Sequence, residues 1–288
     1  MLPARFEYHR PGTLDEALDI LAGQEDAKVL AGGQSLIPLM KLRFAAPAHV
    51  VDINRIPDLE GITEEGGQLR IGALTRNNAI VESELIGARY PVMAAAAPMI
   101  SDPIVRNLGT IGGSLCHADP AGDWGSVMLA LGGSVVLKSK RGEREVPAGE
   151  FLVDTFTASL EPDEILTEVR VPAPSARSGE TYLKLERKVG DFATVAVAVQ
   201  LSLDDGKVGS AGIALTAVGP KNIKAVDAES SLSGADAADE AFAEAARRAA
   251  EVASPISDVR GSAEYKRHII EVFVRRGLGK ALEMAGPA

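Results

Sequence analysis

Two short glycine-rich segments carry the chemistry that this sequence offers most plainly. The first reads Ala31-Gly32-Gly33-Gln34-Ser35-Leu36 and the second reads Thr110-Ile111-Gly112-Gly113-Ser114. Glycine lets a backbone approach a ligand closely and adopt positive φ, and consecutive N–H groups in such loops form a concavity that suits phosphate oxygens. The hydroxyls of Ser35, Thr110 and Ser114 would add donors. Two such loops facing each other could hold both phosphates of a dinucleotide.

Ordinary turns are the competing explanation for each segment. Neither contains the Gly-x-Gly-x-x-Gly pattern of a Rossmann fold or the Gly-Lys-Ser/Thr ending of a P-loop. The residues alone therefore predict a candidate phosphate cradle and leave the alternative open.

Metal and nucleophile chemistry have little support in the sequence. Cys116 is the only cysteine, so the chain cannot form an internal disulfide, a cysteine zinc site or an iron–sulfur cluster of its own. His117 and Asp119 lie two residues apart, which is weak support for a metal site, and Cys116 has no obvious His and Asn partners. The residues alone therefore predict no metal site in this chain and no nucleophilic role for Cys116.

Composition narrows the class of protein. The 288 residues are 46% hydrophobic and carry a formal net charge of −10. This length predicts two or three compact units, and the acidic balance argues against a nucleic-acid-binding protein. The sequence shows neither a signal-peptide pattern nor an apolar run long enough to span a membrane, so a cytoplasmic protein is expected.

The elements that must position the glycine segments can be read from capping and periodicity. Thr13 and Glu16 form a capping box that predicts a helix over 14–22, and a short strand over 27–30 precedes the first segment. The second segment is predicted as a loop over 108–114. Further strands are expected over 50–53, 68–74, 134–140 and 164–171, and further helices over 76–86, 91–99 and 123–131.

A Pro-, Ser- and Gly-rich stretch over 172–179 predicts a boundary. Three strands over 181–185, 193–203 and 209–218 follow it, with Asp204-Asp205-Gly206 as a hairpin turn. Helices over 238–252 and 262–284 complete the chain. Strands and helices do not alternate regularly, so the fold class is α+β and not a doubly wound parallel sheet.

The two glycine segments, with Val105-Arg106-Asn107-Leu108-Gly109 leading into the second, resemble the FAD-binding medium subunit of molybdenum hydroxylases. This family is similar to the flavin domain of xanthine dehydrogenase. The resemblance runs from Phe6 to about Leu282. It implies a two-subdomain vanillyl-alcohol-oxidase (PCMH-type) FAD-binding fold, with a C-terminal domain of a three-stranded antiparallel sheet and helices. The implied domains are 1–55, 56–176 and 177–288.

The same resemblance implies roles for single residues. It places both glycine segments on the FAD pyrophosphate, which assigns Ala31, Gly32, Gly33, Gln34, Ser35, Leu36, Thr110, Ile111, Gly112, Gly113 and Ser114 to cofactor binding. Asp123 matches an acid that hydrogen-bonds the adenosine part, Leu166 an apolar contact near the flavin ring, and Lys184 a lysine at the polar edge of the flavin. The alternatives are a helix N-cap for Asp123, simple core for Leu166 and a solvated strand position for Lys184.

Phe192 stands where the family frequently has tyrosine. Its ring keeps a stacking surface for the isoalloxazine but lacks the hydroxyl group.

The resemblance also implies partner subunits. A large subunit would hold the molybdenum-pterin cofactor and a small subunit two [2Fe–2S] clusters, in a dimer of heterotrimers. Electrons would reach FAD in this chain and pass to an external acceptor. Quinone, NAD and oxygen all remain possible identities for this acceptor. A peripheral contact with the respiratory chain also remains open.

Three segments, 34–38, 40–43 and 117–120, look like the carbon monoxide dehydrogenase branch, which implies aerobic oxidation of CO to CO2. The alternatives are a hydroxylase of an N-heterocycle or an aromatic acyl-CoA, a free-standing flavin oxidoreductase, or a non-catalytic scaffold.

Overall fold

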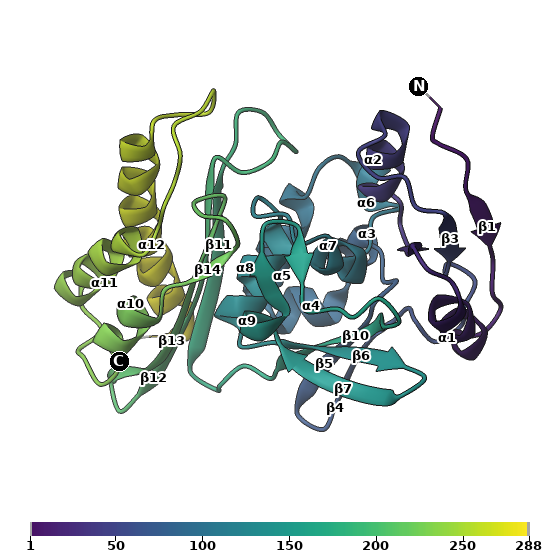
Figure 1. The fold of residues 1–288 in the computed structure, drawn as a ribbon. Coiled ribbons are helices and arrows are strands. Elements are labelled where there is room, and N and C mark those ends of the chain that lie inside the picture. Colours follow the sequence, from purple (N-terminus) through teal and green to yellow (C-terminus); the bar gives the residue numbers. More distant parts are fainter. Residues whose placement is uncertain (1, 287–288) are drawn as a thin grey trace.

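The computed structural model describes residues 2–286, and its N-terminal part is a small parallel sheet (Figure 1). The strands run in the order β1 (Glu7–His9), β3 (His49–Asp52) and β2 (Ala27–Leu30). The helix α1 (Leu14–Gly23) packs on this sheet through Ala17, Leu18 and Leu21, next to Val51.

The capping box that was predicted from the sequence is present at the start of α1. The Glu16 N–H donates to Thr13 Oγ1 at 3.2 Å, and the Gly12 N–H donates to Glu16 Oε2 at 2.7 Å. The first bond satisfies a donor that the first turn of a helix otherwise leaves open. The second differs from the standard capping box, because Glu16 accepts from the N–H of the residue before the N-cap. The start of α1 is therefore set by local sequence.

The middle part is built on a five-stranded antiparallel sheet. In spatial order the strands are β4 (Ile62–Glu65), β5 (Gln68–Gly72), β10 (Ile165–Pro172), β6 (Ser134–Ser139) and β7 (Gly142–Pro147). Its helices are α3 (Asn77–Glu82), α4 (Glu84–Arg89), α5 (Pro91–Ala96), the 3-10 helix η1 (Ala97–Met99), α6 (Pro103–Arg106), α7 (Ile111–His117), α8 (Asp123–Ala130) and α9 (Ala148–Phe151). A two-stranded ribbon, β8 (Leu152–Asp154) and β9 (Thr157–Ala158), completes it. Trp124, Tyr90 and Phe151 are fully buried in its core.

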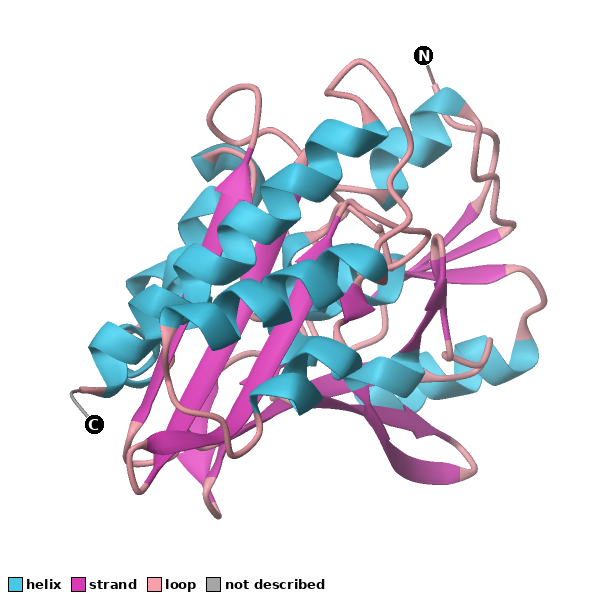
Figure 2. Ribbon diagram, turned by 90° about the vertical axis from the view of Figure 1, so that its left-hand side faces the viewer, coloured by secondary structure: helices cyan, strands magenta, loops and turns pink. Residues whose placement is uncertain are grey.

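The C-terminal part is a four-stranded antiparallel sheet between two helical layers (Figures 1 and 2). Its strands are β11 (Ser178–Leu185), β12 (Val195–Asp204), β13 (Lys207–Thr216) and β14 (Ile223–Lys224). Its own helices are α10 (Val226–Leu232), α11 (Asp239–Glu251) and α12 (Ala263–Ala285). The long α12 lies along β11 and β12, whereas α5 and α8 of the middle part contact the same sheet from the other side.

The alternation of β12 explains this arrangement. Val197 and Val199 belong to the cluster under α11 and α12, whereas Ala196 and Ala198 belong to the core of the middle part. Because successive side chains of a strand point to opposite faces, one strand serves two cores. The large residues face the strand's own helices, and the small ones admit α5 and α8 closely.

The α+β class is confirmed, as are the two N-terminal parts followed by a C-terminal antiparallel sheet with helices, with several local corrections. The C-terminal sheet has a short fourth strand, β14, and the helix α10 follows it. The turn at Arg141 opens into strand β7, and strands β1, β4, β8 and β9 were also missed. These elements are short or lie at sheet edges, where little apolar alternation marks them.

Candidate functional site

The first glycine segment joins the end of β2 to the start of α2 (Leu36–Leu42). Gly33 has a φ of +74°, in the left-handed region that side chains rarely adopt. A Cβ built on Gly33 would lie 2.6 Å from Ile37 Cδ1. The tight turn into α2 therefore requires glycine at this position.

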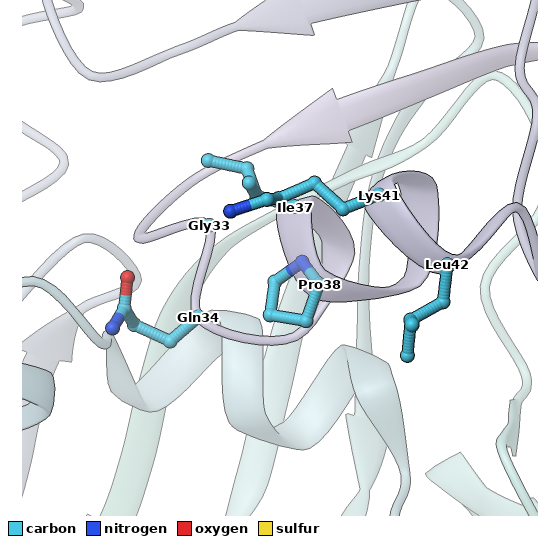
Figure 3. Close-up of a pocket in the computed structure, with 6 residues that line it drawn as sticks. All are labelled: Gly33, Gln34, Ile37, Pro38, Lys41 and Leu42. Carbon is cyan, nitrogen blue, oxygen red and sulfur yellow. The ribbon is translucent and has the colours of Figure 1, made fainter. Parts of the chain in front are cut away.

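This segment presents a run of unused hydrogen-bond donors. Within residues 2–286, the N–H groups of residues 32–36 donate to no protein acceptor, and the side chains of Gln34 and Ser35 make no hydrogen bond. An open depression of about 390 Å³ adjoins them. Figure 3 shows its lining, in which the Gln34 side chain points away from α2; the lining residues are Gly33, Gln34, Ile37, Pro38, Lys41 and Leu42. The arrangement suits an anionic ligand, since consecutive free amides attract oxygen atoms.

The second glycine segment is the start of helix α7, so the predicted loop over 108–114 is wrong for its second half. Thr110 is the N-cap, and its Oγ1 accepts a hydrogen bond from the Gly113 N–H at 3.1 Å. The N–H groups of Ile111, Gly112 and Ser114 donate to the carbonyls of Thr75, Ala73 and Thr110, respectively. These amides are already satisfied, so this segment does not form the amide nest that was predicted.

Close packing explains the glycines of the second segment. A Cβ on Gly112 would lie 2.7 Å from the carbonyl oxygen of Ala73, and one on Gly113 would lie 2.8 Å from Thr110 Oγ1. Of its polar side chains, the Ser114 hydroxyl has no hydrogen-bond partner in the described part of the chain. Ser114 therefore has a hydroxyl without any partner among the described residues, and the Thr110 hydroxyl, which accepts from Gly113, keeps its own O–H available.

The two glycine segments touch, as the sequence interpretation required. A Cβ on Gly32 would lie only 2.1 Å from the Leu108 carbonyl oxygen and 2.8 Å from Gly109 Cα. A Cβ on Gly113 would lie 3.7 Å from the Ala31 Cβ. Backbone thus packs on backbone, which only glycine allows at Gly32.

A clamp of two side chains holds the segments together, and sequence reasoning missed it. The Asn54 amide nitrogen donates to the Ala31 carbonyl at 2.7 Å, and its oxygen accepts from Arg76 Nη2 at 2.7 Å. Arg76 Nη1 donates to the Leu108 carbonyl at 3.0 Å. We call Asn54 and Arg76 the clamp; because they are far apart in sequence from both segments, no spacing pattern could have revealed it.

Asn77 connects the backbone just before the second segment to the core of the middle part. Its N–H donates to the Gly109 carbonyl at 2.9 Å, and its buried side-chain oxygen accepts from Trp124 Nε1 at 2.9 Å. Trp124 belongs to α8, so the segment is fixed to the core of the middle part.

Asp123 and Lys184 lie together at the junction of α8 and β11. Lys184 Nζ donates to Asp123 Oδ2 at 3.0 Å and to the Met99 carbonyl at 2.9 Å, and the Tyr182 hydroxyl donates to Asp123 Oδ1 at 2.6 Å. Burial raises the pKa of Asp123, and the Lys184 charge partly offsets this effect. Both carboxylate oxygens therefore already have protein donors.

The alternatives for these residues can be judged on the geometry. Gly122, not Asp123, is the N-cap of α8, and the Lys184 side chain is 1% exposed, so neither a cap nor a solvated strand position applies. Leu166 lies in β10, buried in the core of the middle part. The contacts of Asp123, Leu166 and Lys184 with the flavin remain predictions from the resemblance.

Phe192 lies on the loop between β11 and β12, and its side chain is 56% exposed. Arg260 holds this loop by donating to the Phe192 carbonyl at 2.8 Å and to Asp191 Oδ1 at 3.0 Å. Gly190 packs on the backbone of Ser101, where a Cβ would lie 2.6 Å from the carbonyl oxygen. The loop is thus fixed beside the segment that leads into α6.

The segment from Cys116 to Asp119 shows no metal geometry. The described residues place no group of three potential ligands there. Burial raises the pKa of the Cys116 thiol to about 12 and lowers the pKa of His117, whose ring packs against Phe156. The Cys116 thiol therefore stays protonated near neutral pH, which does not favour a nucleophilic role.

No helix within residues 2–286 combines the length and the apolar character needed to cross a membrane.

Comparison with known proteins gives consistent matches over the whole chain. Residues 4–174 match the family described as FAD binding domain in molybdopterin dehydrogenase, and residues 180–281 match the CO dehydrogenase flavoprotein C-terminal domain. A carbon monoxide dehydrogenase medium chain from Hydrogenophaga pseudoflava is 44% identical over 283 residues, covering 98% of both chains. A nicotine 6-hydroxylase medium subunit from Paenarthrobacter nicotinovorans is 39% identical, covering 97% of this chain and 98% of the relative.

Solved structures show the same similarity. The carbon monoxide dehydrogenase from Hydrogenophaga pseudoflava that lacks the Mo-pyranopterin moiety contains a chain that matches with a TM-score of 0.95 and 45% identity, covering 99% of both chains.

Proposed function

The chain belongs to the family of FAD-binding medium chains of molybdenum hydroxylases, and from this premise we propose how its residues hold FAD and what complex it serves. It is an oxidoreductase subunit. We propose that it relays electrons between a partner subunit and an external acceptor. When bound, FAD can accept two electrons together or one at a time. It can therefore connect iron–sulfur clusters, which transfer single electrons, with a two-electron reaction.

The observation that carries the binding proposal is the run of five free N–H groups at residues 32–36, beside a depression and against the second segment. These amides and the Ser35 and Ser114 hydroxyls are suited to donate to the pyrophosphate oxygens. Lys41 lines the same depression and forms no ion pair within the described residues, so its charge would favour a dianionic ligand. The second segment contributes mainly a close-packed wall.

Flavin titration with matched glycine variants tests this assignment. Gly33→Val should abolish or strongly weaken FAD binding, because the side chain forces the turn out of its left-handed conformation. Gly66→Val is the control, since Gly66 also has positive φ, at +61°, but lies in the turn between β4 and β5 with open space around it. Equal FAD affinity in both variants would refute the cradle at the first segment.

We infer further that an exposed apolar surface beside the site receives the partner subunit that delivers electrons. Gly190 contacts Ser101, and Arg260 bonds the Phe192 carbonyl, so three loops come together here. Figure 1 shows the loop after β11 and the segment before α12 at the same edge of the molecule. The exposed apolar residues of these segments and of the neighbouring α6 are grouped here as the apolar rim: Ile104 (75% exposed), Val189 (93%), Phe192 (56%), Ile256 (74%) and Val259 (89%).

An apolar rim of this kind favours a subunit over a free-standing enzyme, because exposed apolar side chains gathered at one place mark interaction sites. The proposed partners are a molybdenum-pterin large subunit and a small subunit with two [2Fe–2S] clusters, in a dimer of heterotrimers in the cytoplasm. The parent reaction proposed is oxidation of CO to CO2, supported by 44% identity to a CO dehydrogenase medium chain.

Purification of the chain from its own cells tests the complex and its substrate. We expect two partner chains, with FAD and iron in the complex, and CO-dependent reduction of an artificial acceptor. Reduction by an N-heterocycle instead would favour the alternative supported by the nicotine 6-hydroxylase relative at 39% identity. Oxidation of an organic substrate by the chain alone would favour a free-standing flavoenzyme.

A further inference from the structure

A cluster of three potential metal ligands lies on the N-terminal sheet, apart from the flavin site. Glu7 and His9 are on β1, and His49 begins β3. The register pairs Glu7 with His49, and His9 follows two residues after Glu7 on the same face of its strand. The parallel pairing thus brings together donors that stand 40 residues apart in the sequence.

The donor atoms converge on one point. His9 Nε2 lies 2.9 Å from His49 Nδ1, and His49 Nδ1 lies 3.7 Å from Glu7 Oε2. One ligand atom from each of the three residues lies within 4.8 Å of the others. Zinc–ligand distances of about 2.0–2.2 Å in a tetrahedron give donor–donor separations of about 3.4 Å. The two distances to His49 Nδ1, 2.9 Å and 3.7 Å, fall on either side of this value, and the separation of the His9 and Glu7 donors is within 4.8 Å.

We propose that Glu7, His9 and His49 bind a divalent transition-metal cation, with Zn²⁺ the best match. Two imidazoles and one carboxylate suit Zn²⁺, and they do not suit Mg²⁺ or Ca²⁺, which prefer all-oxygen ligands. The fourth position is open to water.

The surroundings of His49 support a structural site. Its side chain is 17% exposed, whereas that of Glu7 is 75% exposed and free to adjust. Val51 lies on the same face two residues later and is fully buried. Ala27 pairs with His49 from the other neighbouring strand and presents only a methyl group. The imidazole is therefore held in place while the outer side remains open to an ion.

The effect of the metal would be to fasten β1 to β3. Only three residue pairs join these strands, and the cation would bridge side chains from both. Glu7 and His49 lie at the start of the parallel strands, whereas the first glycine segment follows the end of β2, a strand length of about 10 Å away. Metal binding should therefore leave FAD binding unchanged.

Calorimetric titration with ZnCl₂ tests the site on the full chain, produced without a polyhistidine tag and stripped with a chelator. We expect one saturable Zn²⁺ per chain with micromolar or tighter Kd and a rise in Tm on addition of Zn²⁺. Both effects should be lost in His9→Gln and in His49→Gln, with at least a tenfold weaker Kd. His268→Gln is the matched control, because His268 is exposed on α12, far from this sheet.

X-ray absorption of the zinc-loaded chain provides a measurement that does not depend on the folding of a variant. Two imidazole nitrogens in the first coordination sphere support the proposal. A spectrum without histidine ligands, or an absence of saturable Zn²⁺ binding, overturns it and leaves the two histidines as a simple hydrogen-bonded pair.

Discussion

At the residue scale, the site depends on glycines that the sequence allowed us to predict and on polar side chains that it did not. Gly32 and Gly33 could be singled out because glycine beside glycine after an apolar strand has few local explanations. Asn54 and Arg76 could not, because an asparagine and an arginine are common on any surface. Their importance comes from what they join, the Ala31 and Leu108 carbonyls, and this depends on tertiary structure.

Removal of the clamp should weaken flavin binding more than folding. Arg76→Met deletes donors to the Leu108 carbonyl and to Asn54. Since hydrogen bonds from charged groups contribute about 1.5–3 kcal/mol, we expect a roughly 10-fold or greater rise in the Kd for FAD. Arg89→Met is the control, because within residues 2–286 the half-exposed Arg89 pairs with Glu64 alone and contacts neither glycine segment. A FAD affinity equal in the two variants would contradict the role of the clamp.

Glu180 should make stability fall as pH rises. This residue of β11 is 3% exposed, and burial raises its pKa from the usual 4.5 of a glutamate to about 7, although the Val92 N–H donates to it at 3.3 Å. The folded state therefore favours the protonated acid. Stability due to this group is full below about pH 4.5, declines between about 4.5 and 7, and is lost above that range.

Glu180→Gln should thus stabilise the chain at high pH. The gain should approach roughly 3 kcal/mol at pH 8.5 and disappear near pH 4.5, as measured by urea unfolding across this range. Glu25→Gln, at an exposed position, should show no such trend. A gain that is the same at every pH would show that the Glu180 charge is not the cause.

At the element scale, the sequence predicted where a helix begins more reliably than it predicted whether a segment is helix, strand or loop. The Thr13 capping box predicted α1 correctly because the bonds that start this helix are made by neighbours. The start of α7 was mistaken for a loop because glycine has low helix propensity, yet Gly112 is required where the helix passes Ala73. Strand β7 was missed because only one of its residues, Val146, is buried.

The junction of α8 and β11 depends on a buried ion pair. Lys184→Met should destabilise the flavin-free chain by about 3–5 kcal/mol, since it leaves the buried Asp123 carboxylate without its charged partner. Asp123→Asn should destabilise it less, because Lys184 keeps Glu186 at 3.6 Å and the Met99 carbonyl at 2.9 Å. The double variant should lose less than the sum, with a coupling of about 1–3 kcal/mol.

The exposed ion pair of Lys140 and Asp19 serves as the control for the buried ion pair of Asp123 and Lys184. Lys140→Met should leave the free energy of unfolding almost unchanged, because Lys140 is solvated. Denaturant unfolding of all four variants decides the matter; additive effects at Asp123 and Lys184 would show that the pair is not coupled.

At the scale of the whole molecule, the C-terminal sheet is shared between two cores. The described parts of the proposed domains 56–176 and 177–288 meet where a Cβ on Gly212 would lie 1.9 Å from the Ala130 carbonyl oxygen, and those of 1–55 and 56–176 meet where a Cβ on Gly32 would lie 2.1 Å from the Leu108 carbonyl oxygen. Ala196 and Ala198 of β12 lie in the core of the middle part. The C-terminal part therefore needs the middle part to cover one face of its sheet.

Calorimetry should accordingly show one main unfolding transition for the middle and C-terminal parts. Gly212→Ala should lower its Tm by roughly 5–10 °C without splitting it, because the methyl group forces α8 away from β13. Gly279→Ala, in α12 with open space around it, should leave the Tm unchanged or raise it slightly. Two well-separated transitions in Gly212→Ala would mean that the parts fold independently.

The N–H groups are free in the first glycine segment and hydrogen-bonded in the second, so the two segments should take up deuterium at different rates. The N–H groups of residues 32–36, which have no acceptor in the described protein, should exchange rapidly in the flavin-free chain and slow markedly once a pyrophosphate accepts from them. Those of residues 111–114 should be slow in both forms, because the protein already bonds them. Mass spectrometry of these two peptides would thus report cofactor occupancy against a reference built into the same molecule.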